Sequence, residues 1–314
     1  MSNLAIRVLV AIVGIPVVVL LALAGGYWFS GFIALLATIG ILEFYSLAEA
    51  KGAHPQKAVG VVTGLFLVSV FLFARLRDDI LTYFDRFGVQ LPAPTMAQYF
   101  LIVFLVAIPL MMLRELPRNR GSALMNIAVT IFGVLYVPFF FGCLVGIREL
   151  FIPEDFPIFR NFQLSGIGIP DEIREQVYQW GGYTVLVIFA SIWICDSAAY
   201  FAGRAFGKHK LFERVSPKKT WEGAVAGLIG AVAAFIAGKL LVLPYLGLLE
   251  AGVCGAVIGI AGQMGDLAES LLKRDAGVKD SSTLIPGHGG VLDRFDSLLL
   301  SSPLLFLFLD FIVF

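Results

Sequence analysis

The sequence has few cysteines and few charged residues for its length. Its three cysteines, Cys143, Cys195 and Cys254, all lie in apolar segments, and their spacing matches neither a disulfide framework nor a zinc site. We interpret them as small buried hydrophobic residues. Only 15% of the residues are charged and 59% are hydrophobic, so a soluble globular protein of this composition would expose too much apolar surface. The composition therefore predicts a protein of the lipid bilayer.

The chain also has no excess of charge of either sign. It contains 23 basic and 23 acidic residues, which gives a formal net charge of zero. This balance argues against a nucleic-acid-binding protein, which would carry a broadly basic surface. The positions of the charges are therefore more informative than their sum.

Long apolar segments predict an all-α, polytopic integral membrane protein with about nine transmembrane helices. About 20 apolar residues are needed to cross the hydrocarbon core of a bilayer. The predicted helices cover residues 5–24, 28–47, 59–74, 99–113, 123–147, 183–202, 224–243, 246–267 and 298–314. The third and fourth are short for a full crossing, and Pro138 and Pro303 are expected to kink their helices. We divide the chain into N-terminal helices, residues 1–182, and a C-terminal region, residues 183–314, which contains the motifs described below and is expected to be the catalytic part.

Lys and Arg residues indicate the orientation, because cytoplasmic loops retain positive charge during insertion. With the N-terminus inside and nine crossings, the loops around Lys57, Arg118, Lys218 and Lys279 face the cytoplasm. These loops hold most of the basic residues. The segment 148–182 is then an external loop without a catalytic motif. The loop from Arg75 to Arg86 opposes this orientation.

The region from Asp266 to Ser297 concentrates ionisable residues and glycines within an otherwise apolar sequence. Charges in a membrane protein cost several kcal/mol each unless they are paired, hydrated or bound to an ion, so such a concentration marks a site. Its cations suit phosphate groups and its carboxylates suit a hard divalent cation. The residues are Lys273, Arg274, Lys279 and Arg294, and Asp266, Asp280, Asp293 and Asp296. Phosphate and metal together indicate nucleotide chemistry.

This block resembles the signature of the phosphatidate cytidylyltransferases, also called CDP-diacylglycerol synthases. From Ser270 it reads Ser-x-Leu-Lys-Arg, four further residues, Lys-Asp, an apolar-Pro step, His-Gly-Gly and Asp-Arg-x-Asp. A second match reads Asp-Ser-Ala-Ala-Tyr-Phe-Ala-Gly-Arg-Ala-Phe-Gly-Lys from Asp196 and Ser-Pro-Lys-Lys-Thr-Trp-Glu-Gly from Ser216. Phe212 and Glu213 depart from the family pattern. The motifs cover roughly the C-terminal third of the chain.

The resemblance implies an enzyme that transfers CMP from CTP to phosphatidate, with CDP-diacylglycerol and pyrophosphate as products of this step of phospholipid biosynthesis. Negative charge crowds such a transition state, and Mg²⁺ with Lys or Arg would relieve it. The resemblance further implies a metal at Asp266 and Asp293 with Asp296 close by, a homodimer, and an active site facing the cytoplasm from a bacterial inner membrane. The identity of a second metal ion stays open.

The candidate site residues fall into two groups. The expected catalytic residues are Asp266, Lys273, Arg274, Lys279, Asp280, Asp293, Arg294 and Asp296. The expected CTP-binding residues are Arg204, Lys218, Lys219, His288, Gly289 and Gly290, because lysines and flexible backbone amides can bind phosphate. Each group has a structural alternative: the carboxylates could cap helices or pair with neighbouring cations, His288 could be an ordinary hydrogen-bonded histidine, and the lysine loop could anchor topology or bind anionic lipid headgroups.

Two other functions are compatible with the same residues. A CTP-dependent lipid or polyprenol kinase would need the same metal and cations but would transfer the γ-phosphoryl group. A transporter for an anionic solute would explain intramembrane charge without catalysis, although the sequence shows no inverted repeat.

Overall fold

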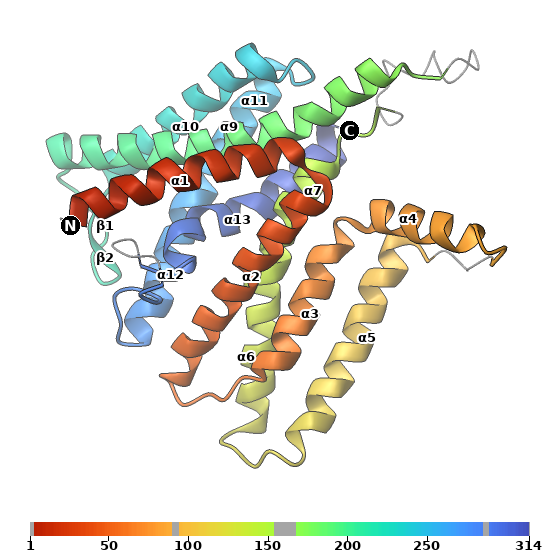
Figure 1. The fold of residues 1–314 in the computed structure, drawn as a ribbon. Coiled ribbons are helices and arrows are strands. Elements are labelled where there is room, and N and C mark those ends of the chain that lie inside the picture. Colours follow the sequence, from red (N-terminus) through yellow and green to blue (C-terminus); the bar gives the residue numbers. More distant parts are fainter. Residues whose placement is uncertain (1–2, 90–93, 154–167, 285–288, 314) are drawn as a thin grey trace. The chain divides into compact units, whose positions relative to one another are not determined.

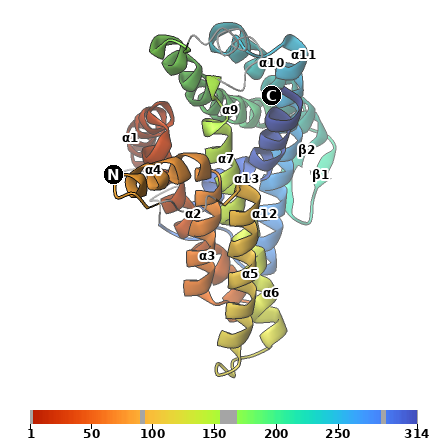
Figure 2. The same ribbon diagram turned by 90° about the vertical axis from the view of Figure 1, so that its right-hand side faces the viewer.

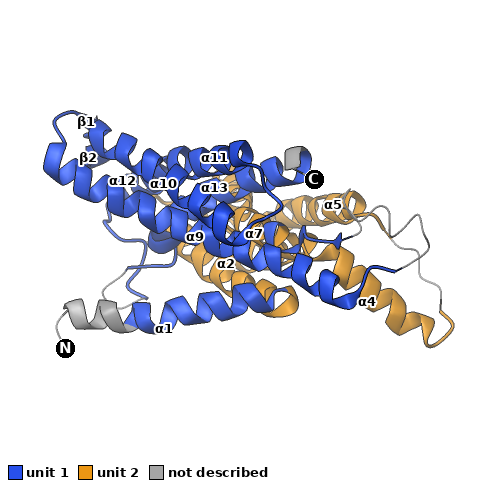
Figure 3. Cartoon of the chain, turned by 90° about the horizontal axis from the view of Figure 1, so that it is seen from above, with its two compact units in different colours: residues 1–25, 147–314 blue, residues 26–146 orange. Residues whose placement is uncertain are grey.

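The computed structural model describes residues 3–89, 94–153, 168–284 and 289–313. They group into two compact units, one formed by residues 1–25 and 147–314 and the other by residues 26–146 (Figure 3). The division predicted at residue 182 falls inside a continuous helix, α9 (Asp171–Phe206). We call the units the catalytic unit and the N-terminal unit, and describe each by itself.

The N-terminal unit is a group of helices that lie side by side (Figure 1). Its elements are α2 (Gly26–Glu49), α3 (Lys57–Val70), α4 (Phe73–Asp85), α5 (Met96–Glu115), α6 (Ala123–Val134), the π-helical turn η1 (Leu135–Phe139) and the first part of α7 (Phe140–Glu149). The predicted disturbance at Pro138 is found as this π-turn, because proline cannot donate the regular helical hydrogen bond. α3 packs against α2, α5 and α6.

The segment from Arg75 to Arg86 is a helix over most of its length and not the loop expected from the sequence. α3 and α4 are separated by a short break, and their axes differ by 86° (Figure 1). Apart from Phe73, most of the side chains of α4 are exposed. A polar helix at a right angle to an apolar one suits the surface of a membrane better than its interior. Its arginines therefore weigh less against the predicted orientation than arginines in a loop between two crossings.

The catalytic unit is built around the long helix α9, which packs along α10 (Trp221–Val242) (Figure 2). Its other elements are α1 (Asn3–Ala24), β1 (Lys210–Phe212), β2 (Ser216–Thr220), α11 (Leu248–Val257), the π-turn η4 (Ile258–Gly262), α12 (Gln263–Asp275), α13 (Leu292–Phe308) and the π-turn η5 (Leu309–Val313). α12 packs against α13, and η4 contacts α10 and α13. The sequence predicted no strands, but β1 and β2 form a small antiparallel pair between α9 and α10.

Arg148 fixes the end of α1 to the rest of the catalytic unit. The side chain is fully buried and donates hydrogen bonds to the carbonyl oxygens of Ala22, Leu23 and Tyr178 at 2.6, 3.0 and 2.9 Å. Cations stabilise helix C-termini because they satisfy the last carbonyls. Gly25 follows with φ of +62°, and a side chain there would collide with Arg148. This arginine, at the start of the segment predicted to be an external loop without a catalytic motif, therefore has a structural role.

Every predicted span coincides with a helical segment in the described part of the chain. Six helices are long and apolar enough to cross a membrane, or seven when α3 and α4 count as one bent span. Their unpacked faces are apolar too: Leu101, Leu105 and Leu113 of α5 are each more than half exposed, as expected of residues that face lipid. The structure confirms an all-α membrane architecture apart from the small strand pair, and the count of nine crossings stays a prediction.

Candidate active site

A polar cavity of about 550 Å³ lies in the catalytic unit between α9, the β1–β2 pair, α10 and α12. Asp196 and Arg204 line it from α9, Lys218 and Lys219 from β2, and Asp266 from α12. The two sequence motifs, which lie far apart in the chain, therefore contribute to one pocket. The predicted CTP-binding cations and one predicted metal ligand line the same space.

Lys219 and Asp266 form a direct link between the motifs. The Lys219 Nζ atom lies 2.5 Å from Asp266 Oδ2, and Ser270 Oγ donates a hydrogen bond of 3.3 Å to Asp266 Oδ1. At the end of β2, Thr220 caps α10, because its Oγ1 atom accepts a hydrogen bond from the Gly223 amide at 3.2 Å. The cap fixes where the strand ends, and thus where Lys218 and Lys219 lie.

Lys273 and Asp293 form the centre of a second cluster, which joins α12 to α13. The Lys273 Nζ atom donates to Asp293 Oδ1 at 2.6 Å and also forms an ion pair with Glu269, one turn earlier on α12. The other oxygen of Asp293 accepts hydrogen bonds from the amide and hydroxyl of Ser281, both at 2.9 Å, and from the Gly290 amide at 2.7 Å. Asp293 therefore holds both ends of the loop between the two helices.

Asp296 brings a further carboxyl group to the same region. It lies within electrostatic range of Asp266, Glu269 and Asp196, and its Oδ1 atom accepts a hydrogen bond of 2.6 Å from the Ser297 amide. The close approach depends on Gly265, where a Cβ atom would lie 2.4 Å from the Asp296 carbonyl oxygen. A glycine beside Asp266 thus allows α12 and α13 to bring these carboxylates together.

The remaining predicted residues are placed less centrally. Arg274 donates to the Val278 carbonyl oxygen at 2.9 Å, and Lys279, Asp280 and Arg294 are exposed. None of the four lines the polar cavity as described. Gly289 adopts φ of +84°, and a side chain there would collide with Asp293. The prediction for His288 lies outside the described residues.

Sequence reasoning missed several residues that line the cavity or hold it in place. Tyr200, Lys210 and Gln263 line it, and Lys210 Nζ donates to the Pro217 carbonyl oxygen at 2.7 Å across the strand pair. The Nδ1 atom of His209 lies 2.6 Å from Glu222 Oε1, which links the start of β1 to the start of α10. The spacing of Lys210 from Lys218 and Lys219 would indicate a shared face only if the strand pair had been recognised.

The carboxylates suit a hard cation by their chemistry. Asp196, Asp266, Glu269 and Asp296 offer oxygen ligands only, which Mg²⁺ prefers. Both Glu269 oxygens are buried without a well-aligned hydrogen bond among the described residues. Within the same part of the chain, no three acidic, His or Cys side chains are grouped closely enough to hold a metal ion, and the ammonium groups of Lys219 and Lys273 balance part of the charge. The chemistry of these oxygen ligands thus fits Mg²⁺, and the predicted metal ligands stay a prediction.

An apolar cavity of about 340 Å³ lies next to the polar one and shares Leu211, Ala224 and Gln263 with it. Its other walls include Trp221 and Met264, which are both more than half exposed. The strand pair and the neighbouring helix ends thus border both the polar cavity and the apolar cavity. This combination fits a molecule with a charged head and an apolar body.

Comparison with known proteins decides the family. The model of the Cytidylyltransferase family matches residues 5–312. The chain belongs to the cytidylyltransferase family. The sequence is also 32% identical over 304 residues to the phosphatidate cytidylyltransferase of Synechocystis sp., covering 96% of this chain and 95% of the relative.

Two further relatives of this cytidylyltransferase differ in their sequence identity to it and in the share of its chain that they match. A phosphatidate cytidylyltransferase of Haemophilus influenzae is 48% identical over 140 residues, which cover 42% of this chain and 48% of the relative. The chloroplastic phosphatidate cytidylyltransferase 4 of Arabidopsis thaliana is 32% identical over 320 residues, which cover 98% of this chain and 74% of the relative. Family membership and the apolar helices identify an integral membrane enzyme of the nucleotidyltransferase class.

Proposed function

We propose that this cytidylyltransferase transfers CMP from CTP to phosphatidate, with CDP-diacylglycerol and pyrophosphate as products. The observation that carries the proposal is the joint placement of the polar and apolar cavities around Leu211, Ala224 and Gln263. A soluble acceptor would need only the polar cavity. A phospholipid acceptor fits both, with its phosphate among the charged residues and acyl chains along the apolar wall.

The side chains of the polar cavity would orient the two substrates and neutralise the charge of their phosphate groups. Lys218 and Arg204, which line it, would bind the triphosphate and stabilise the departing pyrophosphate. The phosphate of phosphatidate attacks the α-phosphorus, and the bond from this atom to the β-phosphate oxygen breaks. Because a phosphomonoester has a second pKa of about 6, it is largely a dianion at pH 7 and needs no general base.

Mg²⁺ would be held by Asp266 and Asp296, with Glu269 beside them and Asp293 kept as a predicted ligand. The ion would neutralise phosphate oxygens and the leaving group. In the described structure Asp293 is engaged by Lys273, Ser281 and Gly290. This engagement supports a second role for Asp293, which is to position the α12–α13 loop.

Isotope placement tests the reaction. Purified protein is supplied with Mg²⁺, phosphatidate and CTP labelled at either the α- or the γ-phosphorus. The proposal expects α-label in the lipid and γ-label in pyrophosphate. Transfer of the γ-label to lipid would identify a lipid kinase instead. Absence of CTP turnover by correctly folded protein would leave a transporter as the better explanation.

Replacement of Lys218 should separate a nucleotide contact from a topological anchor. A charge-assisted hydrogen bond to phosphate contributes roughly 1.5–3 kcal/mol, so Lys218→Ala should raise the KM for CTP or lower kcat by at least about tenfold. Steady-state kinetics in detergent measure both. Arg214→Ala is the matched control, because Arg214 lies in the turn between β1 and β2 and does not line the cavity. Equal kinetics for the two variants would leave the lysine as an anchor.

Orientation is a further part of the proposal, with the polar cavity on the cytoplasmic side of a bacterial inner membrane. The native cysteines are all buried and can be replaced. In that background, Cys at Glu213 or Val278, two exposed positions, should resist a membrane-impermeant thiol reagent in intact cells. Cys at Glu172, in the segment predicted to be external, should react. Labelling of the cysteines at positions 213 and 278 but not of the cysteine at position 172 would show that the orientation is the reverse of the one proposed.

We also propose a homodimer, as the family resemblance implies. Light scattering of the purified protein with correction for bound detergent should give twice the mass of the 34.1 kDa chain. A mass of one chain would contradict it.

A further inference from the structure

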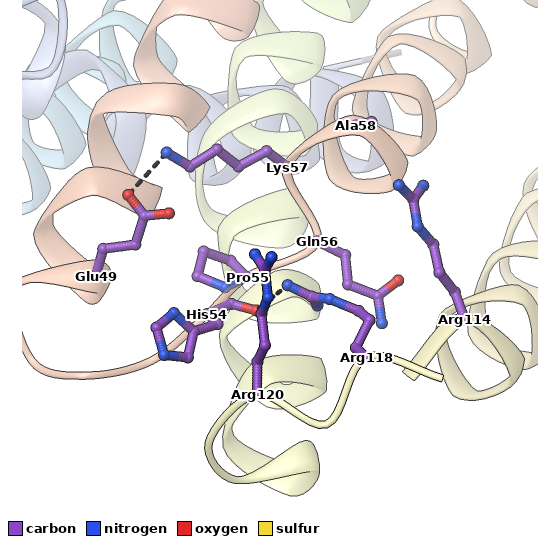
Figure 4. A pocket seen from close by; sticks show the side chains of 9 residues that line it. All are labelled: Glu49, His54, Pro55, Gln56, Lys57, Ala58, Arg114, Arg118 and Arg120. Carbon is purple, nitrogen blue, oxygen red and sulfur yellow. Dashed lines mark hydrogen bonds and ion pairs between the residues drawn. The ribbon is translucent and has the colours of Figure 1, made fainter. Parts of the chain in front are cut away.

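A second charged pocket lies in the N-terminal unit and shares no lining residue with the polar cavity. It has a volume of about 330 Å³ (Figure 4). Four cations line it, Lys57, Arg114, Arg118 and Arg120, with one carboxylate, Glu49. The sequence suggested only a topological role for these basic residues. The structure brings them from two separate loops to one concave site.

A buried polar network fixes the floor of this pocket. Glu115 is buried and accepts hydrogen bonds from Gln56 Nε2 at 2.7 Å, Asn126 Nδ2 at 2.6 Å and Arg118 Nη1 at 2.8 Å. The backbone amide of His54 donates to Asn126 Oδ1 at 2.7 Å. The network therefore ties the loop before α3 to the end of α5 and the start of α6. A buried hydrogen-bond network of this kind favours one arrangement of its elements.

The pocket carries more positive charge than its own carboxylates neutralise. Arg118 pairs with Glu115, and Lys57 pairs with Glu49 at 2.7 Å. Within the described part of the chain, the guanidinium groups of Arg114 and Arg120 have no acidic partner, and Figure 4 draws no interaction for either of them. Two charges with up to five donors each are thus presented by a built site.

A second polar atom in the wall also lacks a partner. Gln56 is 3% exposed, and its Oε1 atom accepts no hydrogen bond from the described residues. An amide oxygen needs a hydroxyl or amine donor. The Gln56 oxygen has almost no accessible surface, so the groups that a ligand can reach are the guanidinium groups of Arg114 and Arg120.

The pocket also lies at the ends of candidate membrane spans, where lipid headgroups are expected. It forms where α2 and α5 end and where α3 and α6 begin, and α2, α5 and the helix formed by α6, η1 and α7 are candidate membrane spans. Arginine forks match phosphate oxygens in pairs, and helix N-termini such as that of α3 favour anions.

We propose that this pocket binds a phosphate group, supplied by the headgroup of an anionic phospholipid or by a soluble phosphate ion, through Arg114 and Arg120. Arg118 and Lys57, each already paired, complete the positive wall. The site is separate from the one that would hold CTP and phosphatidate. It gives the N-terminal unit a binding role of its own.

Calorimetric titration of the purified protein in detergent tests the proposal. The ligands are dihexanoyl phosphatidylglycerol below its micelle concentration and inorganic phosphate, each titrated into three proteins. These are the unchanged chain, Arg114→Gln/Arg120→Gln, and the control Lys51→Gln/Lys239→Gln, which removes the same charge outside the pocket. Arg114 and Arg120 are exposed, so Arg114→Gln/Arg120→Gln should keep the thermal midpoint of the unchanged chain. If the double variant does not fold, each single arginine variant is titrated in its place.

The expected result is a loss of at least tenfold in affinity in the arginine variant and no such loss in the control. Loss for the lipid alone identifies the headgroup as the ligand, whereas loss for both ligands identifies phosphate itself. A smaller loss for both, or an equal loss in the control, overturns the proposal. CMP transfer by the arginine variant is measured separately, so failure of this proposal and failure of the proposed enzyme activity are distinguishable.

Discussion

Asp266→Asn is expected to lower the rate of CMP transfer by at least about a hundredfold, because it removes a charge that two parts of the site use. Asp266 lines the polar cavity and forms the ion pair with Lys219. Asparagine keeps the shape of the side chain but would bind a hard cation more weakly. It would also release Lys219, one of the expected phosphate-binding groups. Pyrophosphate release at saturating CTP and varied Mg²⁺ measures the loss.

The control for this variant is Asp275→Asn, at the far end of the same helix. Asp275 is exposed and does not line the polar cavity, so turnover should stay within about twofold. Both proteins should insert into the membrane and elute from a sizing column as the unchanged chain does. Turnover of Asp266→Asn close to that of Asp275→Asn at limiting Mg²⁺ would remove Asp266 from the site.

The helices were largely predictable from the sequence because their signal is composition over about 20 residues. The directions of the helices were not predictable in the same way. Residues 59–74 are one apolar run, yet the chain turns by 86° after Val70, and hydropathy does not report a turn between apolar residues. The strands β1 and β2 also escaped prediction, because Lys210–Phe212 and Ser216–Thr220 are short and their pairing depends on contacts with the ends of α9 and α10.

The site was predictable as a set of residues but not as an arrangement. The motifs contain Lys219, Asp266, Lys273 and Asp293, and the structure confirms that they lie in one unit. Sequence spacing cannot say that Lys219 pairs with Asp266 while Lys273 pairs with Asp293. The first pair is separated by α10, α11 and η4, and the second by the loop between α12 and α13. The arrangement comes from packing of α12 on α13 and from the cap at Thr220.

The basic pocket of the N-terminal unit escaped prediction for a related reason. Arg114, Arg118 and Arg120 are close in the sequence and have an adequate explanation as cytoplasmic charges. Their relation to Lys57 is visible only when the network around Glu115 is known. Buried Glu115 is the last residue of the apolar helix α5 and gives no periodic signal of its own.

Lys273→Met should destabilise the protein by about 3–5 kcal/mol, because it removes one member of a buried ionic cluster and leaves its partners uncompensated. The side chain of Lys273 is 10% exposed, and those of Glu269 and Asp293 are 0% and 5% exposed. Methionine matches the length of the lysine stem, so the loss of charge, and not a cavity, dominates the effect. The thermal midpoint in detergent should fall by roughly 5–10 °C.

Two further variants show whether this loss comes from buried charge. Lys279→Met removes a nearby exposed lysine and should change stability by less than about 0.5 kcal/mol. In Lys273→Met/Glu269→Gln, one of the two uncompensated carboxylates becomes neutral, so part of the lost stability should return, whereas CMP transfer should not. A thermal midpoint for Lys273→Met equal to that of Lys279→Met would contradict a cluster held by charge. In that case Asp293 would hold the α12–α13 loop through Ser281 and Gly290 alone, since those hydrogen bonds do not involve the lysine.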